Sequence, residues 1–155
     1  MIHKKLGFTL IELLTVVLIL AVLTSIALPQ YRKSIYRAEA ANALINLKSL
    51  YDSAKRAYAM NSEFPTSFAG LDVKLLADET PGTTLISGGF KFEFVTNPNG
   101  IKGCRYPGAQ TDTLCLQVSY VRNGKRDVYT CSATGKYVSV CESMGTCTNG
   151  TCVIE

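Results

Sequence analysis

Six cysteines are the residues of this chain whose chemistry is easiest to specify, and all lie in its last third: Cys104, Cys115, Cys131, Cys141, Cys147 and Cys152. An even number of cysteines in a small domain is typical of disulfides formed in an oxidising compartment. Metal or redox chemistry is the alternative, but the chain has no Cys-x-x-Cys pair and zinc normally takes more closely spaced ligands. We expect three disulfides. Several pairings are possible, and we favour pairing between neighbours: Cys104 with Cys115, Cys131 with Cys141 and Cys147 with Cys152.

A single carboxylate, Glu12, lies inside the apolar stretch of residues 8–28. The stretch meets the length of about 20 residues that a helix needs to cross the hydrocarbon of a bilayer. An acid there costs roughly 2.5–3.5 kcal/mol at the bilayer centre, less near an end, and normally marks a function. A place near a helix N-terminus recovers only about 0.3–1 kcal/mol through the helix dipole. Glu12 therefore needs a partner.

The residues around this acid resemble the processing site of type IV prepilins. The resemblance rests on Gly7 followed by Phe8-Thr9-Leu10-Ile11-Glu12, on the uninterrupted apolar stretch, and on Pro29 with Tyr31 after it. It implies that a prepilin peptidase removes residues 1–7, a short basic leader, and that the new N-terminus, Phe8, is N-methylated. It also implies that Glu12 of an incoming subunit pairs with the Phe8 amine of a subunit already in the filament. A cytoplasmic assembly ATPase and an inner-membrane platform protein would act indirectly.

An ordinary secretory signal peptide is the competing interpretation, because Ser25-Ile26-Ala27 could serve as a small-x-small cleavage site. A signal peptide has an apolar core of about 7–15 residues, which is shorter than this stretch, and it gains nothing from an internal acid. N-terminal sequencing distinguishes the two, since the mature chain would begin at Phe8 or at Leu28. We favour the prepilin interpretation, in which the helix is a single membrane span with a cytoplasmic N-terminus.

The composition argues against an enzyme. The sole histidine, His3, lies in the predicted leader, so the mature chain would lack the usual general base of hydrolases and the commonest transition-metal ligand. The formal net charge of +4 falls to +2 once Lys4 and Lys5 are removed, which leaves 14 basic and 12 acidic residues and little drive for non-specific nucleic-acid binding. We expect no catalytic residue, cofactor, metal or small-molecule substrate.

The remainder of the 155-residue chain predicts one α+β domain. Pro29 should kink the first helix without ending it. Residues 29–60 continue as an amphipathic helix, whose apolar stripe recurs at steps of three and four residues and would pack on a sheet: Ala40, Leu44, Leu47, Tyr51, Ala54 and Tyr58. Residues 61–89 contain Pro65, Pro81 and Gly88-Gly89 and predict a connecting loop.

Residues 90–155 predict the head of the molecule. Alternation of apolar and polar residues in the first two expected strands, an Asn123-Gly124 pair between two β-rich runs, and a turn at Thr134-Gly135 predict a four-stranded antiparallel sheet. Its strands are expected near residues 90–94, 114–120, 127–131 and 137–140. Residues 141–155 have no regular period and predict a C-terminal loop tied by disulfides.

Together these features favour a structural subunit of a type IV pilus, held in the lipid of the inner membrane and then polymerised with its own kind into an extracellular fibre. Such fibres serve adhesion, twitching motility or DNA uptake. A pseudopilin of a type II secretion system shares the leader, the acid and the helix, so it stays open as an alternative. A membrane-anchored binding protein or enzyme that never polymerises would need a cleft with catalytic residue types, and the sequence offers no nucleophile motif.

Overall fold

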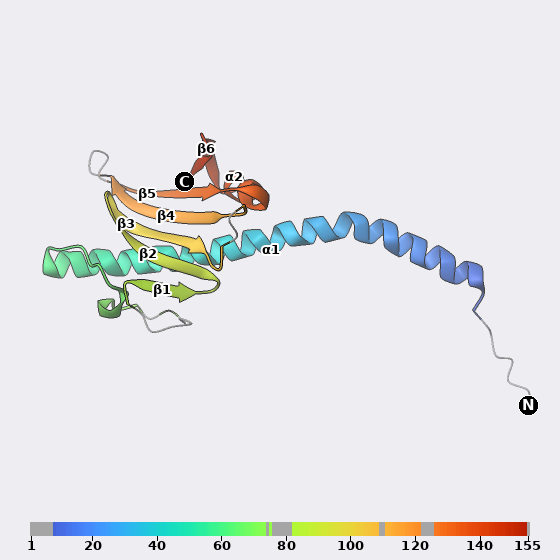
Figure 1. The fold of residues 1–155 in the computed structure, drawn as a ribbon, viewed down its shortest axis with the longest axis horizontal. Helices are drawn as coiled ribbons and strands as arrows, with labels where there is room; N and C mark the ends of the chain where they lie inside the picture. Colours follow the sequence, from blue (N-terminus) through green and yellow to red (C-terminus); the bar gives the residue numbers. More distant parts are fainter. Residues whose placement is uncertain (1–7, 74, 76–81, 109–110, 122–125, 155) are drawn as a thin grey trace, which may run out of the picture. The chain divides into compact units, whose positions relative to one another are not determined.

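The computed structural model describes residues 8–73, 75, 82–108, 111–121 and 126–154. It divides into two compact units, Met1–Ile35 and Tyr36–Glu155, and helix α1 (Leu10–Asn61) contributes residues to both. The predicted leader with Gly7 and the predicted Asn123-Gly124 turn lie outside the described residues. The α+β class is confirmed, because a long N-terminal apolar helix is followed by an antiparallel sheet and C-terminal disulfides (Figure 1).

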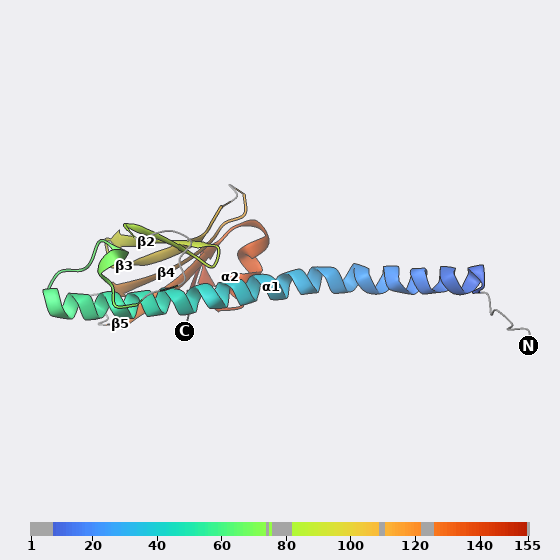
Figure 2. The same cartoon turned by 90° about the horizontal axis from the view of Figure 1, so that it is seen from below.

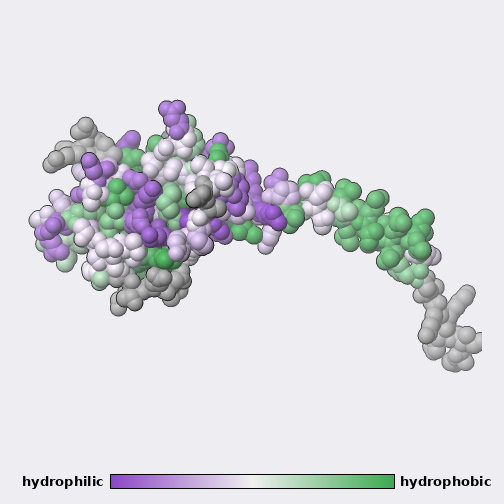
Figure 3. All heavy atoms as spheres, in the orientation of Figure 1, coloured by the Kyte–Doolittle hydropathy of each residue, from purple (hydrophilic) through white to green (hydrophobic). Residues whose placement is uncertain are grey.

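The described part of the first unit is the N-terminal portion of α1. Every residue from Phe8 to Arg32 is exposed, and Figure 3 shows the apolar part of this stretch as hydrophobic surface. The helix continues through Pro29, as expected, because a proline inside a helix removes one backbone donor but leaves the turns on either side able to form. The kink at Pro29 stays a prediction.

In the second unit α1 buries one side, and Figure 2 shows the sheet lying along this part of the helix. The buried helix residues are Ala40, Ala43, Leu47, Leu50, Tyr51, Ser53 and Ala54. The predicted stripe is confirmed at four of its six positions, while Leu44 is half-buried and Tyr58 is 51% exposed. Full burial of one large apolar side chain contributes about 1.5–3 kcal/mol, so this stripe is a main source of the contact between helix and sheet.

The sheet has seven antiparallel strands rather than the predicted four, in the order β1-β2-β3-β4-β5-β7-β6. The strands are β1 (Thr84–Ser87), β2 (Phe90–Thr96), β3 (Asn99–Arg105), β4 (Leu114–Val121), β5 (Arg126–Ala133), β6 (Gly145–Thr148) and β7 (Thr151–Ile154). Alternate residues such as Phe92, Leu116 and Cys131 face α1 and are fully buried. A short 3-10 helix, η1 (Phe68–Gly70), lies in the connection between α1 and β1.

One predicted strand is wrong. Residues 137–140 form no strand, because η2 (Gly135–Tyr137) and α2 (Val138–Glu142) occupy this position. The buried residues here are Tyr137, Val140 and Cys141. Val140 and Cys141 follow Tyr137 by three and four residues, so all three lie on one face of a helix, whereas a strand would bury every second residue. The disulfide from Cys141 to β5 holds α2 in place.

The predicted C-terminal loop is also more regular than expected, because it contains the hairpin of β6 and β7. Asn149 and Gly150 make its two-residue turn, with φ of 52° and 78°. Positive φ at both positions is the requirement of a type I′ turn, which Asn-Gly meets with least strain. Strands β1 and β3 were likewise missed, in stretches where glycines and a proline favoured turns.

Candidate assembly segment and disulfide-tied head

The assembly segment, which we define as residues 8–28, is exposed and apolar on all sides. Phe8 is 73% exposed, Leu10 80% and Leu18 62%, and the residues between and after them are exposed as well. Among the described residues, α1 is the one helix long and apolar enough to cross a membrane by length and composition. A helix that is hydrophobic all round is stable in a protein core or in lipid, so the segment needs an apolar environment around it.

Glu12 closes a capping box with Thr9 at the start of α1. Its Oε2 accepts hydrogen bonds from the Thr9 backbone N–H at 2.8 Å and from Thr9 Oγ1 at 2.6 Å. In return, the Glu12 backbone N–H donates to Thr9 Oγ1 at 3.3 Å. This reciprocal arrangement satisfies two amide donors that the first turn of a helix otherwise leaves open. The sequence analysis missed this box, although the Thr-x-x-Glu spacing was there to indicate it.

The same geometry leaves the second carboxylate oxygen available. Both side-chain hydrogen bonds of Glu12 go to Oε2, and no described residue donates to Oε1. An ionised carboxylate accepts at both oxygens, so the box does not saturate it. Glu12 can cap its own helix and still accept from a second donor.

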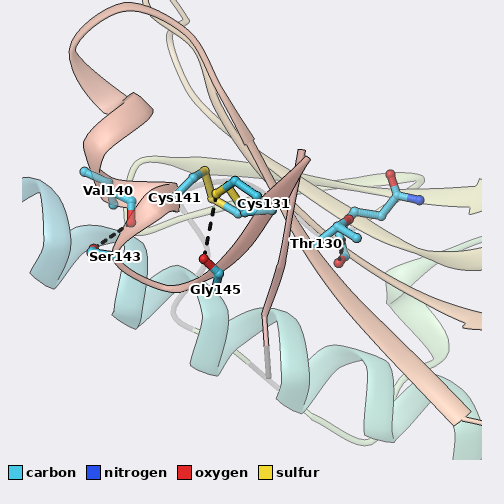
Figure 4. Close-up of a disulfide and its surroundings, with 9 residues drawn as sticks. Thr130, Cys131, Val140, Cys141, Ser143 and Gly145 are labelled. Carbon is cyan, nitrogen blue, oxygen red and sulfur yellow. Dashed lines mark hydrogen bonds between the residues drawn. A yellow bond between two sulfur atoms is a disulfide. The ribbon is translucent and has the colours of Figure 1, made fainter. Parts of the chain in front are cut away.

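The three disulfides join neighbouring cysteines, the pairing favoured from the sequence: Cys104–Cys115, Cys131–Cys141 and Cys147–Cys152. The first links directly opposed residues of β3 and β4, and the third links directly opposed residues of the β6–β7 hairpin. The second carries α2 onto β5, as Figure 4 shows, with Cys131 and Cys141 both buried. Each bridge therefore restrains a different connection of the head.

An acidic side chain of β5 fastens the sheet to α1. The Tyr51 hydroxyl donates to Asp127 Oδ1 at 3.0 Å, and Lys55 Nζ donates to Oδ2 at 2.8 Å. Burial raises the pKa of the Tyr51 phenol well above its usual value, and the bond to Asp127 raises it further. The same carboxylate raises the pKa of Lys55. These are structural contacts, and no sequence pattern indicated the pairing.

A second carboxylate ties the connection after α1 back to the helix. Asp72 accepts from Arg56 Nε at 2.7 Å and Nη2 at 2.8 Å, and it also accepts from Ser53 Oγ. The Arg56 guanidinium, followed by Ser53, lowers the pKa of Asp72 to about 2. Within the part of the chain that the structure describes, no three His, Cys, Asp or Glu residues are grouped as metal ligands would be.

The comparisons with known proteins agree with this arrangement. The family model for the prokaryotic N-terminal methylation motif matches residues 2–28. The chain is 40% identical over 58 residues, 37% of its length and 26% of the relative's, to the type IV major pilin protein PilA of Myxococcus xanthus. It is 33% identical over 95 residues, 61% of its length and 62% of the relative's, to a fimbrial protein of Pseudomonas aeruginosa. It thus spans less than two thirds of either relative. No solved structure matches it.

These findings place the chain among prokaryotic proteins that carry an N-terminal methylation motif on an apolar helix. In this chain a disulfide-tied α+β head follows that helix. Within that class the chain is similar to type IV pilins and fimbrial proteins over part of its length, and the resemblance noted in the sequence is confirmed.

Proposed function

We propose that this chain is the structural subunit of a type IV pilus. A prepilin peptidase cuts between Gly7 and Phe8, Phe8 is N-methylated, and the mature subunit waits in the inner membrane before it polymerises into a surface filament. The observation that carries the proposal is the assembly segment: it is exposed and apolar all round, and it lies within the matched methylation motif.

Polymerisation through this segment is favourable on physical grounds. In the membrane its side chains contact lipid tails, and in a filament they would contact the same segment of neighbouring subunits. Both surroundings are apolar, so the exchange costs little hydrophobic stabilisation, and close helix packing can favour assembly. Energy for extraction would come from an assembly ATPase acting through a platform protein. The head of each subunit would remain folded throughout, because its core does not involve the assembly segment.

Glu12 is proposed to recognise the neighbouring subunit. After cleavage the Phe8 amine of the same chain would stand four residues before Glu12, with the capping box between them. A neighbour's Phe8 amine could instead approach Oε1, which the box leaves open. Pairing would neutralise both charges in an apolar filament core, where an isolated charge is costly.

Three substitutions test this role in cells that assemble the fibre. Glu12→Ala should abolish sheared surface fibres, while processing and membrane insertion persist. Thr9→Ala breaks the capping box but keeps the carboxylate, so fibres should be reduced far less. Thr24→Ala removes another exposed hydroxyl of the segment, which bonds only to its own helix at Leu20 and Ala21, and should leave assembly intact. Fibres that survive Glu12→Ala would refute the proposal, and mass spectrometry of the product would check cleavage before Phe8.

A pseudopilin of a type II secretion system is the alternative within this class. Both curated relatives carry the names of fibre proteins, and the three disulfides suit an exposed extracellular head, which favours the pilus. Deleting the gene should remove surface fibres and twitching if the pilus assignment is right. Loss of protein secretion with unchanged fibres would instead identify a pseudopilin.

A further inference from the structure

Two of the three disulfides are neighbours on one face of the sheet. Cys131 of β5 and Cys152 of β7 are directly opposed in the strand register, and they are buried at 0% and 3% exposure. Cys131 is bonded to Cys141 of α2 (Figure 4). Cys152 is bonded to Cys147, which is opposed to it on β6. Because directly opposed residues of two strands point to the same face, the two bridges lie next to each other.

A cavity in the head brings the same bridges together. Its volume is about 180 Å³, and it is lined by Cys141 from α2 and by Cys147 and Cys152 from the C-terminal hairpin. One space is therefore bordered by a cysteine of the first bridge and by both cysteines of the second. The lining of this cavity is independent of the strand register and leads to the same conclusion about the two bridges.

These two bridges differ in their access to solvent. Cys147 is exposed, because β6 is an edge strand of the sheet and the side chains from Thr146 to Thr148 are uncovered. Cys131 and Cys141 are buried, at 0% and 2% exposure. Thiol–disulfide exchange requires access of the attacking thiolate to a sulfur of the bridge. A thiolate from solution should therefore react first at Cys147.

The third disulfide stands apart from this pair. Cys115 of β4 precedes Leu116, which is fully buried on the face that packs on α1, so Cys115 points to the opposite face. Cys104 is directly opposed to Cys115 and shares that face. The residues opposed to this bridge on the neighbouring strands are Lys91 and Ser132, neither of which carries a sulfur.

We propose that Cys131, Cys141, Cys147 and Cys152 form a thiol-exchange relay, which takes a dithiol as its reactant and admits it at Cys147. One thiolate of the dithiol attacks Cys147 Sγ, forms a mixed disulfide there and releases the Cys152 thiolate. Cys152 then attacks Cys131 Sγ, which forms a Cys131–Cys152 bond and releases the Cys141 thiolate. The second thiol of the dithiol attacks its own sulfur in the mixed disulfide and releases Cys147. The dithiol loses two electrons and two protons, and Cys141 and Cys147 gain them as thiols.

The strand register allows the new bond to form. Directly opposed residues of an antiparallel pair have Cα atoms about 4.5–5.5 Å apart, and a disulfide joins Cα atoms about 4.4–6.8 Å apart. A Cys131–Cys152 bond therefore requires no movement of β5 against β7. The change falls on α2, which loses its covalent link to β5 when Cys141 is released. The relay thus converts reduction at the exposed hairpin into release of α2 from that link.

Removing one sulfur tests the exchange without any added reductant. Cys147→Ser leaves Cys152 as a free thiol beside the Cys131–Cys141 bridge. The full chain would be purified in detergent, quenched in acid, alkylated with N-ethylmaleimide in denaturant and mapped by mass spectrometry. We expect a Cys131–Cys152 linked peptide and alkylated Cys141 in at least about a tenth of the chains, because the exchange replaces one disulfide with another. Alkylation of Cys152 alone, with the Cys131–Cys141 bridge intact, would overturn the relay.

Cys115→Ser is the matched control, because it leaves Cys104 as a free thiol on the other face with no bridge opposed to it. Alkylation should appear at Cys104 alone, and the other two bridges should stay intact. Scrambling of all three bridges in this control would assign the exchange to unfolded chains and would count against the relay.

A second measurement uses the wild-type chain and a limiting amount of dithiothreitol. We expect alkylated Cys141 and Cys147 together with the Cys131–Cys152 linked peptide. Opening of the Cys131–Cys141 bridge should be at least about tenfold slower in Cys147→Ser/Cys152→Ser, because an attack within one molecule has a much higher effective concentration. Equal or faster opening in that double variant would mean that the dithiol reaches the buried bridge directly, and the relay would be refuted.

Discussion

Replacing Tyr51 with phenylalanine should weaken the attachment of the sheet to α1 by an amount that the structure allows us to estimate. Tyr51 is 1% exposed and its hydroxyl donates to Asp127. A hydrogen bond to a charged group contributes about 1.5–3 kcal/mol. The Asp127 side chain is 23% exposed and keeps its bond to Lys55, so the lower end applies. We expect Tyr51→Phe to lower the free energy of unfolding by about 1.5 kcal/mol.

Urea unfolding of the full chain in detergent micelles, followed by circular dichroism, measures this loss. Tyr129→Phe is the matched control. Tyr129 is half-buried and lies on the same face of β5 as Asp127, and its hydroxyl makes no hydrogen bond among the described residues. It should change the free energy by less than about 0.5 kcal/mol. A double-mutant cycle of Tyr51→Phe with Asp127→Ala should show a coupling of about 1 kcal/mol, since the two residues share one bond.

High pH gives an independent check of the same contact. The folded pKa of Tyr51 lies above its usual value of 10.0, so the stabilisation is complete below pH 10 and is lost as the pH rises further. The wild type should therefore lose more stability than Tyr51→Phe over that range. If Tyr51→Phe matches Tyr129→Phe at neutral pH and shows no coupling to Asp127, the reasoning is refuted.

Three further predictions concern the head. Gly103→Ala should cost roughly 1–3 kcal/mol in the same urea assay, because a Cβ there would lie 2.6 Å from a buried phenylalanine ring of β2. Replacing Cys131 and Cys141 together by serine should cost about 2–4 kcal/mol, and unchanged thermal melting would contradict this. Arg56 holds the pKa of Asp72 at about 2, below its usual 3.8. The ionised Asp72 therefore stabilises the folded head fully above pH 4, and this stabilisation is lost towards pH 2. Asp72→Asn should flatten an acid titration over that window.

The helix could be predicted well from the sequence because its signals are long and redundant. The apolar length of residues 8–28 and the stripe from Ala40 to Ala54 each span several turns, so a single ambiguous residue does not change the interpretation. The predicted 8–60 agrees closely with Leu10–Asn61. The expected burial of Tyr58 was wrong because the last turn of α1, residues 58–61, is exposed. The sequence of the helix does not show where the packed sheet ends.

The sheet was predicted less completely because a short strand shows its alternating pattern over only a few residues. Strand β3 contains Gly100 and Gly103, which weaken a strand signal. Both are required by close packing: added Cβ atoms would meet the Val118 backbone and the Phe92 ring. Residues 137–140 contain an aromatic and two β-branched residues, which favour a strand, but the chain forms η2 and α2 there and Cys141 is bonded to Cys131. Local sequence could not reveal any of these tertiary constraints.

The two portions of α1 differ in the way their apolar residues are distributed, and this difference bears on function. From Ala40 to Ala54 the apolar side is a stripe, so one partner, the sheet of the same chain, is enough to bury it. From residue 8 to residue 28 the apolar surface goes all the way round, so a single packed layer could not cover it. It requires an environment that surrounds the helix, either lipid or several copies of the same helix. The exposed segment is thus the strongest physical reason to expect both a membrane stage and a polymer, and Glu12 is the residue through which the change from one to the other can be tested.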